Sequence, residues 1–309
     1  MIREISENTW RQLLTSKCES IFFNPDFLNV VSKSFDYKLH YLVYTEGGNV
    51  VLAAAVFSKK DKIVIPLAFT YTPIYYSESI SERKYLIVFN HLVKYLKANW
   101  SDVSLRLPIT LTDLRPFIWA GFRTRLRYTY IKAPDGDIHK SVSKNYIRGL
   151  NEGLTFKVEN PSKTTIEKNL LFFKNYGLSA SSHVSYLNFF THAAQRDYLI
   201  SFNAYKSEQL ISSNLVLIDR ATKTLYTLLL YSSNDKYSHT FIYKNGIDWA
   251  IKERFASIDY CGANEENIAI FKSYFNPELR QYVVVTYSRK RDFMRRFKNR
   301  LISMVQAMF

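Results

Sequence analysis

Cysteine, glycine and proline are all scarce in this chain: two, nine and eight residues among 309. Cys18 and Cys261 stand far apart without a C-x-x-C spacing, which excludes a disulfide framework and favours a reducing compartment. No apolar run of about 18 residues is available to cross a bilayer. The N-terminus, MIREISENTW, carries acids where a signal peptide has its apolar core. We therefore expect a cytoplasmic protein, either soluble or peripheral at the inner face of the membrane.

Several catalytic signatures are also absent. The sequence has no G-x-S-x-G, no H-E-x-x-H and no G-x-x-x-x-G-K-[ST] motif, which argues against a serine hydrolase, a zinc protease and a P-loop enzyme. The histidines show no metal-like spacing with carboxylates or cysteines, so we expect no metal site.

Apolar residues and positive charge are abundant. Hydrophobic residues make up 47% of the chain and aromatic residues 16%, enough for two domains that each bury a core. The formal net charge of +15 favours an anionic partner, which nucleic acid, a phosphorylated substrate or a membrane surface would satisfy.

The second half of the chain repeats the plan of the first. Residues 39–71 and 198–231 each predict three strands joined by tight turns, and each set is followed by a helix, a short strand, another helix and a last strand. The predicted fold class is therefore α/β with a mixed sheet, in two tandem domains of the same plan. The expected domains are 1–135 and 154–288, joined by a basic helix within 136–153. Two such domains would form an interdomain cleft, a favoured place for ligands.

Residues 289–309 predict a basic amphipathic helix. Seven basic residues stand against the single acid Asp292 between Thr286 and Phe309, and apolar residues recur at steps of three and four. Such a helix could dock on the protein itself, lie on an anionic membrane or bind RNA, and its charge alone does not separate these uses.

Three stretches resemble the Fem aminoacyl transferases and related FemAB-like proteins with two tandem GNAT-fold domains. They are KSVSKNYIRGLNEGLTFKV (140–158), SHTFIYKNGIDWAIKERFASIDYCGAN (238–264) and IAIFKSYFNPELRQYVVV (268–285). The resemblance implies transfer of an acyl group, usually an amino acid from its tRNA, to an amine of a phosphate-bearing envelope precursor. Charged tRNA and that precursor are the implied partners. An aminoacyl ester is already activated, so such a protein needs no nucleophile and mainly positions its substrates.

The connections after the two predicted meanders bear on the donor. GNAT enzymes that use acetyl-CoA hold its pyrophosphate on a glycine-rich loop at a helix N-terminus. The corresponding stretches here, 68–79 and 231–239, contain no glycine. We therefore expect no bound cofactor, and an aminoacyl-tRNA co-substrate rather than acetyl-CoA. Two alternatives remain: a CoA-dependent N-acetyltransferase acting on a sugar or amine, and a non-catalytic protein that binds RNA or membrane.

Two groups of candidate site residues follow from spacing. Lys144 and Arg148 lie four apart on one predicted helix face and could bind one phosphate, or could simply be solvated. Asp259 ends a short strand beside Gly262, where it could act as a general base or bond to the following turn.

The other candidates are single residues. Lys272 could bind a phosphate or carboxylate from a helix whose Phe271 and Phe275 face the core. His239 stands near a helix start, which suggests an anion site, or a plain helix capped by Ser238 or Thr240. Tyr71 is implied by the resemblance as a contact to the acceptor.

Overall fold

The computed structural model describes residues 1–309 except 15–19, 67–69, 172, 174–178, 234 and 295–309. The chain forms two compact units. Unit 1 comprises Met1–Cys18, Tyr37–Leu126 and Tyr282–Phe309, and unit 2 comprises Glu19–Asp36 and Arg127–Gln281.

In unit 1 the elements form a sheet with helices packed on it. The strands are β1 (Arg3–Ile5), β2 (Lys38–Glu46), β3 (Asn49–Lys59), β4 (Lys62–Val64), β5 (Ile74–Tyr76) and β6 (Asp102–Arg106), and the helices are α1 (Glu7–Leu14), α3 (Glu82–Asn99) and α4 (Arg115–Trp119). The β2–β3 turn uses Gly47 and Gly48, both at positive φ, as a two-residue hairpin loop requires. Ser81 caps α3 by accepting the N–H of Lys84.

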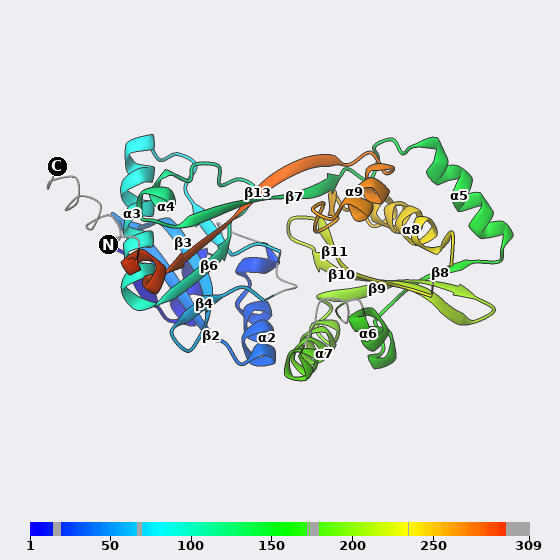
Figure 1. The fold of residues 1–309 in the computed structure, drawn as a ribbon, viewed down its shortest axis with the longest axis horizontal. Helices are drawn as coiled ribbons and strands as arrows, with labels where there is room; N and C mark the ends of the chain where they lie inside the picture. Colours follow the sequence, from blue (N-terminus) through cyan, green and yellow to red (C-terminus); the bar gives the residue numbers. More distant parts are fainter. Residues whose placement is uncertain (15–19, 67–69, 172, 174–178, 234, 295–309) are drawn as a thin grey trace, which may run out of the picture. The chain divides into compact units, whose positions relative to one another are not determined.

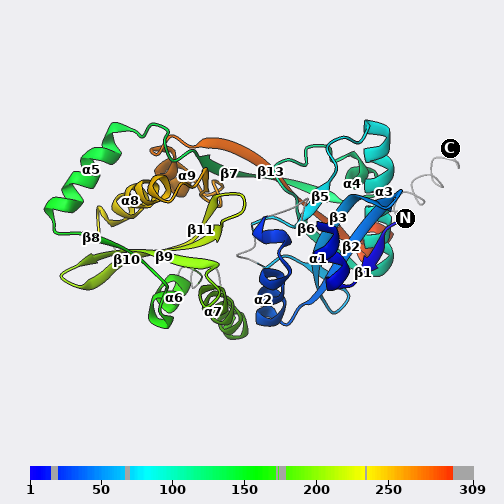
Figure 2. The same ribbon diagram turned by 180° about the vertical axis from the view of Figure 1, so that it is seen from behind.

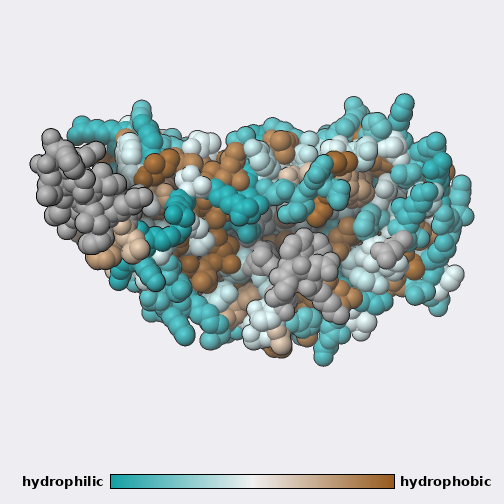
Figure 3. All heavy atoms as spheres, viewed as in Figure 1, coloured by the Kyte–Doolittle hydropathy of each residue, from teal (hydrophilic) through white to brown (hydrophobic). Residues whose placement is uncertain are grey.

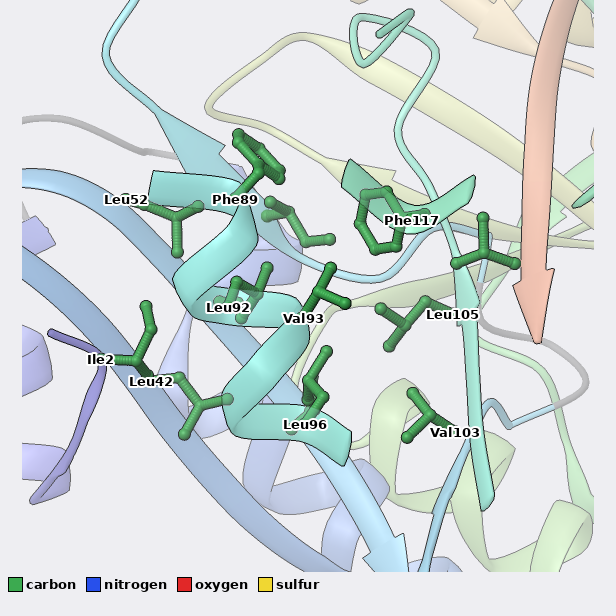
Figure 4. Close-up of a cluster of buried hydrophobic side chains, with 14 of the residues drawn as sticks. Ile2, Leu42, Leu52, Phe89, Leu92, Val93, Leu96, Val103, Leu105 and Phe117 are labelled. Atoms are coloured by element: carbon green, nitrogen blue, oxygen red, sulfur yellow. The ribbon is translucent and has the colours of Figure 1, made fainter. Parts of the chain in front are cut away.

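The core of unit 1 lies between α3 and the sheet. Figure 4 shows Phe89, Leu92, Val93 and Leu96 of α3 close to apolar side chains of the strands and to Phe117 of α4. These α3 residues are at most 1% exposed. The sequence predicts an apolar stripe on this helix, which the structure buries: Tyr85, Val88 or Phe89, Leu92 and Leu96.

In unit 2 helices cover both faces of a sheet, with α8 and α9 on one face and α6 and α7 on the other (Figures 1 and 2). The strands are β8 (Thr155–Glu159), β9 (Leu199–Lys206), β10 (Gln209–Asp219), β11 (Thr224–Ser232) and β12 (Ser257–Asp259). The helices are η1 (Ile21–Phe23), α2 (Pro25–Phe35), α5 (Lys140–Asn151), α6 (Lys163–Leu170), α7 (Ala180–Ala194), α8 (Ser238–Lys252) and α9 (Glu266–Ser273).

The two units exchange segments between the halves of the chain. Strand β7 (Arg123–Lys132) ends the first half but pairs antiparallel with β12 in unit 2, and β13 (Glu278–Ser288) ends the second half but pairs antiparallel with β6 in unit 1. Helix α2 also belongs to unit 2, where Phe27 and Phe35 make edge contacts with aromatic rings of α7. The repeated element order is present, but the compact units are interleaved, whereas the sequence suggests contiguous domains 1–135 and 154–288. This exchange has a physical reason: β7, β13 and α2 are stabilised by the sheet or helix on which their apolar side chains are buried, wherever that element stands in the sequence.

Three predicted elements are corrected. The third strand of the first meander stops at Val64 rather than Tyr71, because Pro66 has no N–H for the ladder. The sequence pattern predicts a helix over Tyr243–Arg254, whereas α8 begins five residues earlier, at Ser238. The pattern also predicts a helix over Thr112–Ala120, whereas α4 begins only at Arg115. Of the predicted helix 289–309, residues 289–294 are helical and the remainder lies outside the described residues.

The start of that C-terminal helix contacts unit 1. Asp292 is 7% exposed and pairs with Lys97 of α3 at 3.5 Å, while the guanidinium of Arg289 donates to backbone carbonyls at the end of α3. Phe293 and Met294 remain exposed. The first turn therefore docks on the protein, which was one of the uses expected for this helix.

Gly246 of α8 sets how closely this helix approaches the sheet of unit 2. A Cβ at this position would stand 2.9 Å from two ring atoms of Phe202 on β9, and Phe202 is 3% exposed. We expect Gly246→Val to lower the free energy of unfolding by about 2 kcal/mol, because the packed ring has no free space to enter. Lys252→Val on the exposed side of α8 is the control, and denaturant unfolding is the measurement. Equal stability of the two variants would contradict this packing.

Candidate active site

The candidate site lies in unit 2, where strands β11 and β12 separate. The two strands run parallel and pair only from Thr224–Ser257 to Tyr226–Asp259, and β11 then continues to Ser232 while β12 ends. The register of β11 against β10 shifts just beyond this point, so that Leu228 is an extra, bulged residue. Bulges are over-represented beside active sites, and the carboxyl ends of separating parallel strands are a favoured place for ligands.

Asp259 stands at the separation and organises the turn that follows it. Its side chain is 1% exposed, and Oδ1 accepts hydrogen bonds from the Thr129 hydroxyl at 2.5 Å and from the Cys261 N–H at 2.7 Å. Thr129 lies on β7, and its hydroxyl oxygen also accepts the Gly262 N–H at 3.2 Å. The bond from Asp259 to the following turn, one of the two roles expected for this residue, is therefore present.

Lys272 holds the same turn from the other side. It is 8% exposed, and its ammonium donates to the carbonyl oxygen of Tyr260 and, at 2.9 Å, to that of Gly262. Burial lowers the pKa of Lys272 to about 8, against the opposing influence of Cys261 and Asp259. Binding a phosphate would require these internal bonds to open, so the geometry favours a positioning role over the anion site expected from the sequence.

Cys261 lies at the centre of this turn. It has a φ of 51°, and Gly262 follows at 126°, so the backbone here adopts left-handed conformations that most residues avoid. The thiol is partly exposed and lies 3.5 Å from the Asp259 carbonyl oxygen. A buried carboxylate, a buried ammonium and a partly exposed thiol thus meet within one turn.

Tyrosines surround the turn and stay protonated at neutral pH. Burial raises the pKa of Tyr226 well above its ordinary value, and the charge of Asp259 adds to this effect. Burial raises the pKa of Tyr260 in the same way. The hydroxyl groups of these residues can therefore donate hydrogen bonds but do not ionise in the physiological range.

The N-terminus of α8 is capped by an internal carboxylate. Asp235 Oδ1 accepts the N–H groups of Tyr237 at 2.9 Å and Ser238 at 2.8 Å. The expected capping by Ser238 or Thr240 is wrong, because Ser238 lies in the first turn and its hydroxyl donates to the carbonyl of Asp235. An acid thus already occupies two of the backbone N–H groups at this helix start and adds a negative charge there, which disfavours an incoming anion.

His239 follows this cap. Its ring makes an edge contact with Phe271 of α9 at 5.8 Å, and its buried Nε2 has no hydrogen-bond partner among the described residues. Burial lowers its pKa, so the ring is neutral at pH 7. A neutral ring beside the Asp235 carboxylate is poorly suited to hold an anion.

The remaining candidates lie elsewhere. Lys144 and Arg148 are exposed on α5. Tyr71 belongs to unit 1, where it is 9% exposed and contacts the ring of Tyr282 at 5.6 Å. The structure thus gathers Asp259 and Lys272 around one turn, with His239 linked to the same helix α9 through Phe271. Thr129, Cys261 and Asp235 complete this arrangement.

Unit 1 has a small pocket of about 10 Å³ where β3, β4 and β6 come together. Its lining is almost entirely apolar and contains no ionisable side chain: Ala55, Val56, Phe57, Ile63, Val64, Ile65, Pro66, Thr72, Pro73 and Leu105. This pocket therefore offers no group for acid–base chemistry.

The described residues provide neither a metal-binding cluster nor a membrane-spanning helix. They contain no group of three or more histidine, cysteine or acidic side chains that could hold a metal ion. None of the helices they form is both long enough and apolar enough to span a bilayer.

Comparison with known proteins relates the chain to solved structures. No protein-family model and no curated protein matches the sequence. The crystal structure of FemX aligns over 92% of this chain and 96% of its own, with a TM-score of 0.62 and 12% identity. A tandem GNAT protein from the clavulanic acid biosynthesis pathway covers 94% and 98%, with a TM-score of 0.55 and 12% identity.

A third structure is the C-terminal domain of a protein assigned as a lysylphosphatidylglycerol synthetase from Agrobacterium fabrum. It aligns over 91% of this chain and 92% of its own, with a TM-score of 0.55 and 12% identity. Identity this low establishes the fold alone. The chain has the tandem GNAT fold, and the likeness to Fem-type structures that the sequence suggests is confirmed at the level of that fold.

Proposed function

We propose that the protein is an acyltransferase that moves an aminoacyl group from an ester donor, such as charged tRNA, to an amine of a phosphate-bearing envelope precursor. The fold supports acyl transfer, since the similar structures include FemX and a tandem GNAT protein. One observation favours an ester over acetyl-CoA as the acyl donor: the carboxylate of Asp235 accepts backbone N–H groups at the start of α8.

Unit 1 supports the same preference. The connection before α3, Ser77–Ser81, has no glycine, and the Ser81 hydroxyl already accepts the Lys84 N–H. Glu82 places a further negative charge in the first turn of α3. Both helix starts that follow a meander thus carry their own cap and an acid, which disfavours the pyrophosphate of coenzyme A.

The turn after β12 suggests how transfer would proceed. The amine nitrogen attacks the ester carbonyl carbon, a C–N bond forms, the C–O bond to the donor breaks, and the amine proton ends on the departing ribose oxygen. Asp259 is the proposed general base for that proton, held in place by Thr129 and the Cys261 N–H. The backbone at the Leu228 bulge would offer an N–H donor to the developing oxyanion. Lys144 and Arg148 are the proposed phosphate ligands of the acceptor.

Acetyl-CoA should not bind with useful affinity. Calorimetric titration of the full chain with acetyl-CoA should give no saturable heat. A dissociation constant in the low micromolar range for the wild type would instead support the alternative, a CoA-dependent N-acetyltransferase.

The cap at the start of α8 can be tested by denaturant unfolding. Asp235→Ala should lower the free energy of unfolding by about 1 kcal/mol, because the start of α8 loses its cap. Asp235→Asn is the matched control, since asparagine can keep the cap without the charge.

A further inference from the structure

Helix α5 is held rigidly on unit 2 by one face. Val142 is 2% exposed, and a Cβ on Gly149 would approach Leu154 and Phe241 to 3.2 Å. The ring of Tyr146 stacks on Phe241 of α8 with ring centroids 5.3 Å apart. These contacts fix which side of α5 faces outward.

The outward face combines large aliphatic side chains with bases. Ile147 is 55% exposed and Leu150 is 47% exposed, and Lys140, Lys144 and Arg148 are exposed beside them. None of these three basic side chains has a hydrogen bond or ion pair within the part of the chain that the structure describes, and Lys140–Asn151 contains no acid. Hydrophilic residues predominate over the α5 end of the face shown in Figure 3.

We propose that α5 is a membrane-contact helix that lies on an anionic bilayer surface. Ile147 and Leu150 enter the boundary between headgroups and acyl chains, and the three bases contact lipid phosphates. The two aliphatic side chains decide the occupant, because a soluble phosphate or an RNA backbone would give them no apolar environment.

This inference rests on the proposed function in one respect: the phosphate-bearing acceptor would lie at the lipid surface that α5 contacts. Binding to vesicles is measured without donor, acceptor or turnover, so the membrane contact and the transfer reaction can fail separately. Because the full chain is used throughout, residues 289–309 contribute equally to every variant.

The experiment is co-sedimentation with vesicles of phosphatidylcholine, with and without phosphatidylglycerol. Ile147→Gln/Leu150→Gln should weaken binding to the anionic vesicles by about tenfold or more, because the apolar contact is lost. Lys144→Gln/Arg148→Gln should weaken it by about 25-fold at low salt, and this difference should shrink as salt screens the charges. Circular dichroism confirms that each variant is folded.

Val184→Gln/Ile270→Gln is the matched control, since these side chains are 55% and 50% exposed on other helices of unit 2. It should bind like the wild type. The proposal is overturned if the wild type ignores anionic vesicles, if the control loses as much as the α5 aliphatic variant, or if only the basic variant loses binding. The last result would leave α5 as a site for soluble anions.

Discussion

Replacing Asp259 by asparagine should lower the transfer rate by about 10²- to 10⁴-fold while the fold remains intact. A general base contributes about this much to a proton-transfer step, and an amide cannot take the amine proton. The amide oxygen can still accept the bonds that Thr129 and the Cys261 N–H now donate to Asp259. The measurement is transfer of radiolabel from a mixed pool of aminoacyl-tRNA to an envelope extract.

Asp259→Ala separates the catalytic from the positioning role. Alanine leaves the buried Thr129 hydroxyl and the Cys261 N–H without the acceptor they share, at a cost of about 1–3 kcal/mol for each unsatisfied group. We therefore expect Asp259→Ala to lose both stability and transfer, whereas Asp259→Asn loses transfer alone. If Asp259→Asn transfers at the wild-type rate, Asp259 only holds the turn and another group must take the proton.

Much of the fold could be predicted because its signals are local. The sequence predicts a helix over Pro25–Phe35 with Asn24 as its N-cap, and α2 has these bounds and this cap. The signal is readable because N-cap chemistry and a proline at the first position act within a few residues. The stripe of α3 and the Gly47–Gly48 turn are of the same kind. The exchange of β7, β13 and α2 could not be predicted, because the pairing of strands far apart in sequence leaves no periodic pattern within either strand.

The candidate site was predictable only in part. The position of Asp259 at a strand end was correct, since a short apolar strand followed by a glycine is readable. Thr129 escaped notice because it is joined to Asp259 only through pairing of β7 with β12, 130 residues apart in sequence. The burial of Lys272 was also missed, since a lysine between two phenylalanines looks solvent-exposed until the turn that it bonds is known. Asp235 did carry a signal, an acid just before a helix start, but the expected start lay too far along the chain.

Raising the pH from about 7 to about 10 should stabilise the region around β12 and α9. The pKa of Lys272 is about 8 in the folded protein, below the ordinary value of 10.5, because its ammonium is buried. Between these two values the unfolded chain binds more protons than the folded one, so stability rises with pH. The whole gain, about 3 kcal/mol, would be approached near pH 10 at the ordinary conversion of about 1.36 kcal/mol for each pKa unit.

The measurement is hydrogen exchange of peptides that cover β12 and α9, corrected for the intrinsic effect of pH on exchange. Lys272→Met removes the titrating group and should abolish the pH-dependent gain in protection, while a peptide from the α3 region of unit 1 should behave alike in both proteins. The window closes above about pH 10, where the buried tyrosines reverse the trend: burial raises the folded pKa of Tyr226 and Tyr260, so the unfolded chain releases their protons first. Equal pH dependence in the wild type and Lys272→Met would mean that the ammonium of Lys272 is not desolvated. In that case the hydrogen bonds from a buried Lys272 ammonium to the carbonyls of Tyr260 and Gly262 would not explain how this turn is held.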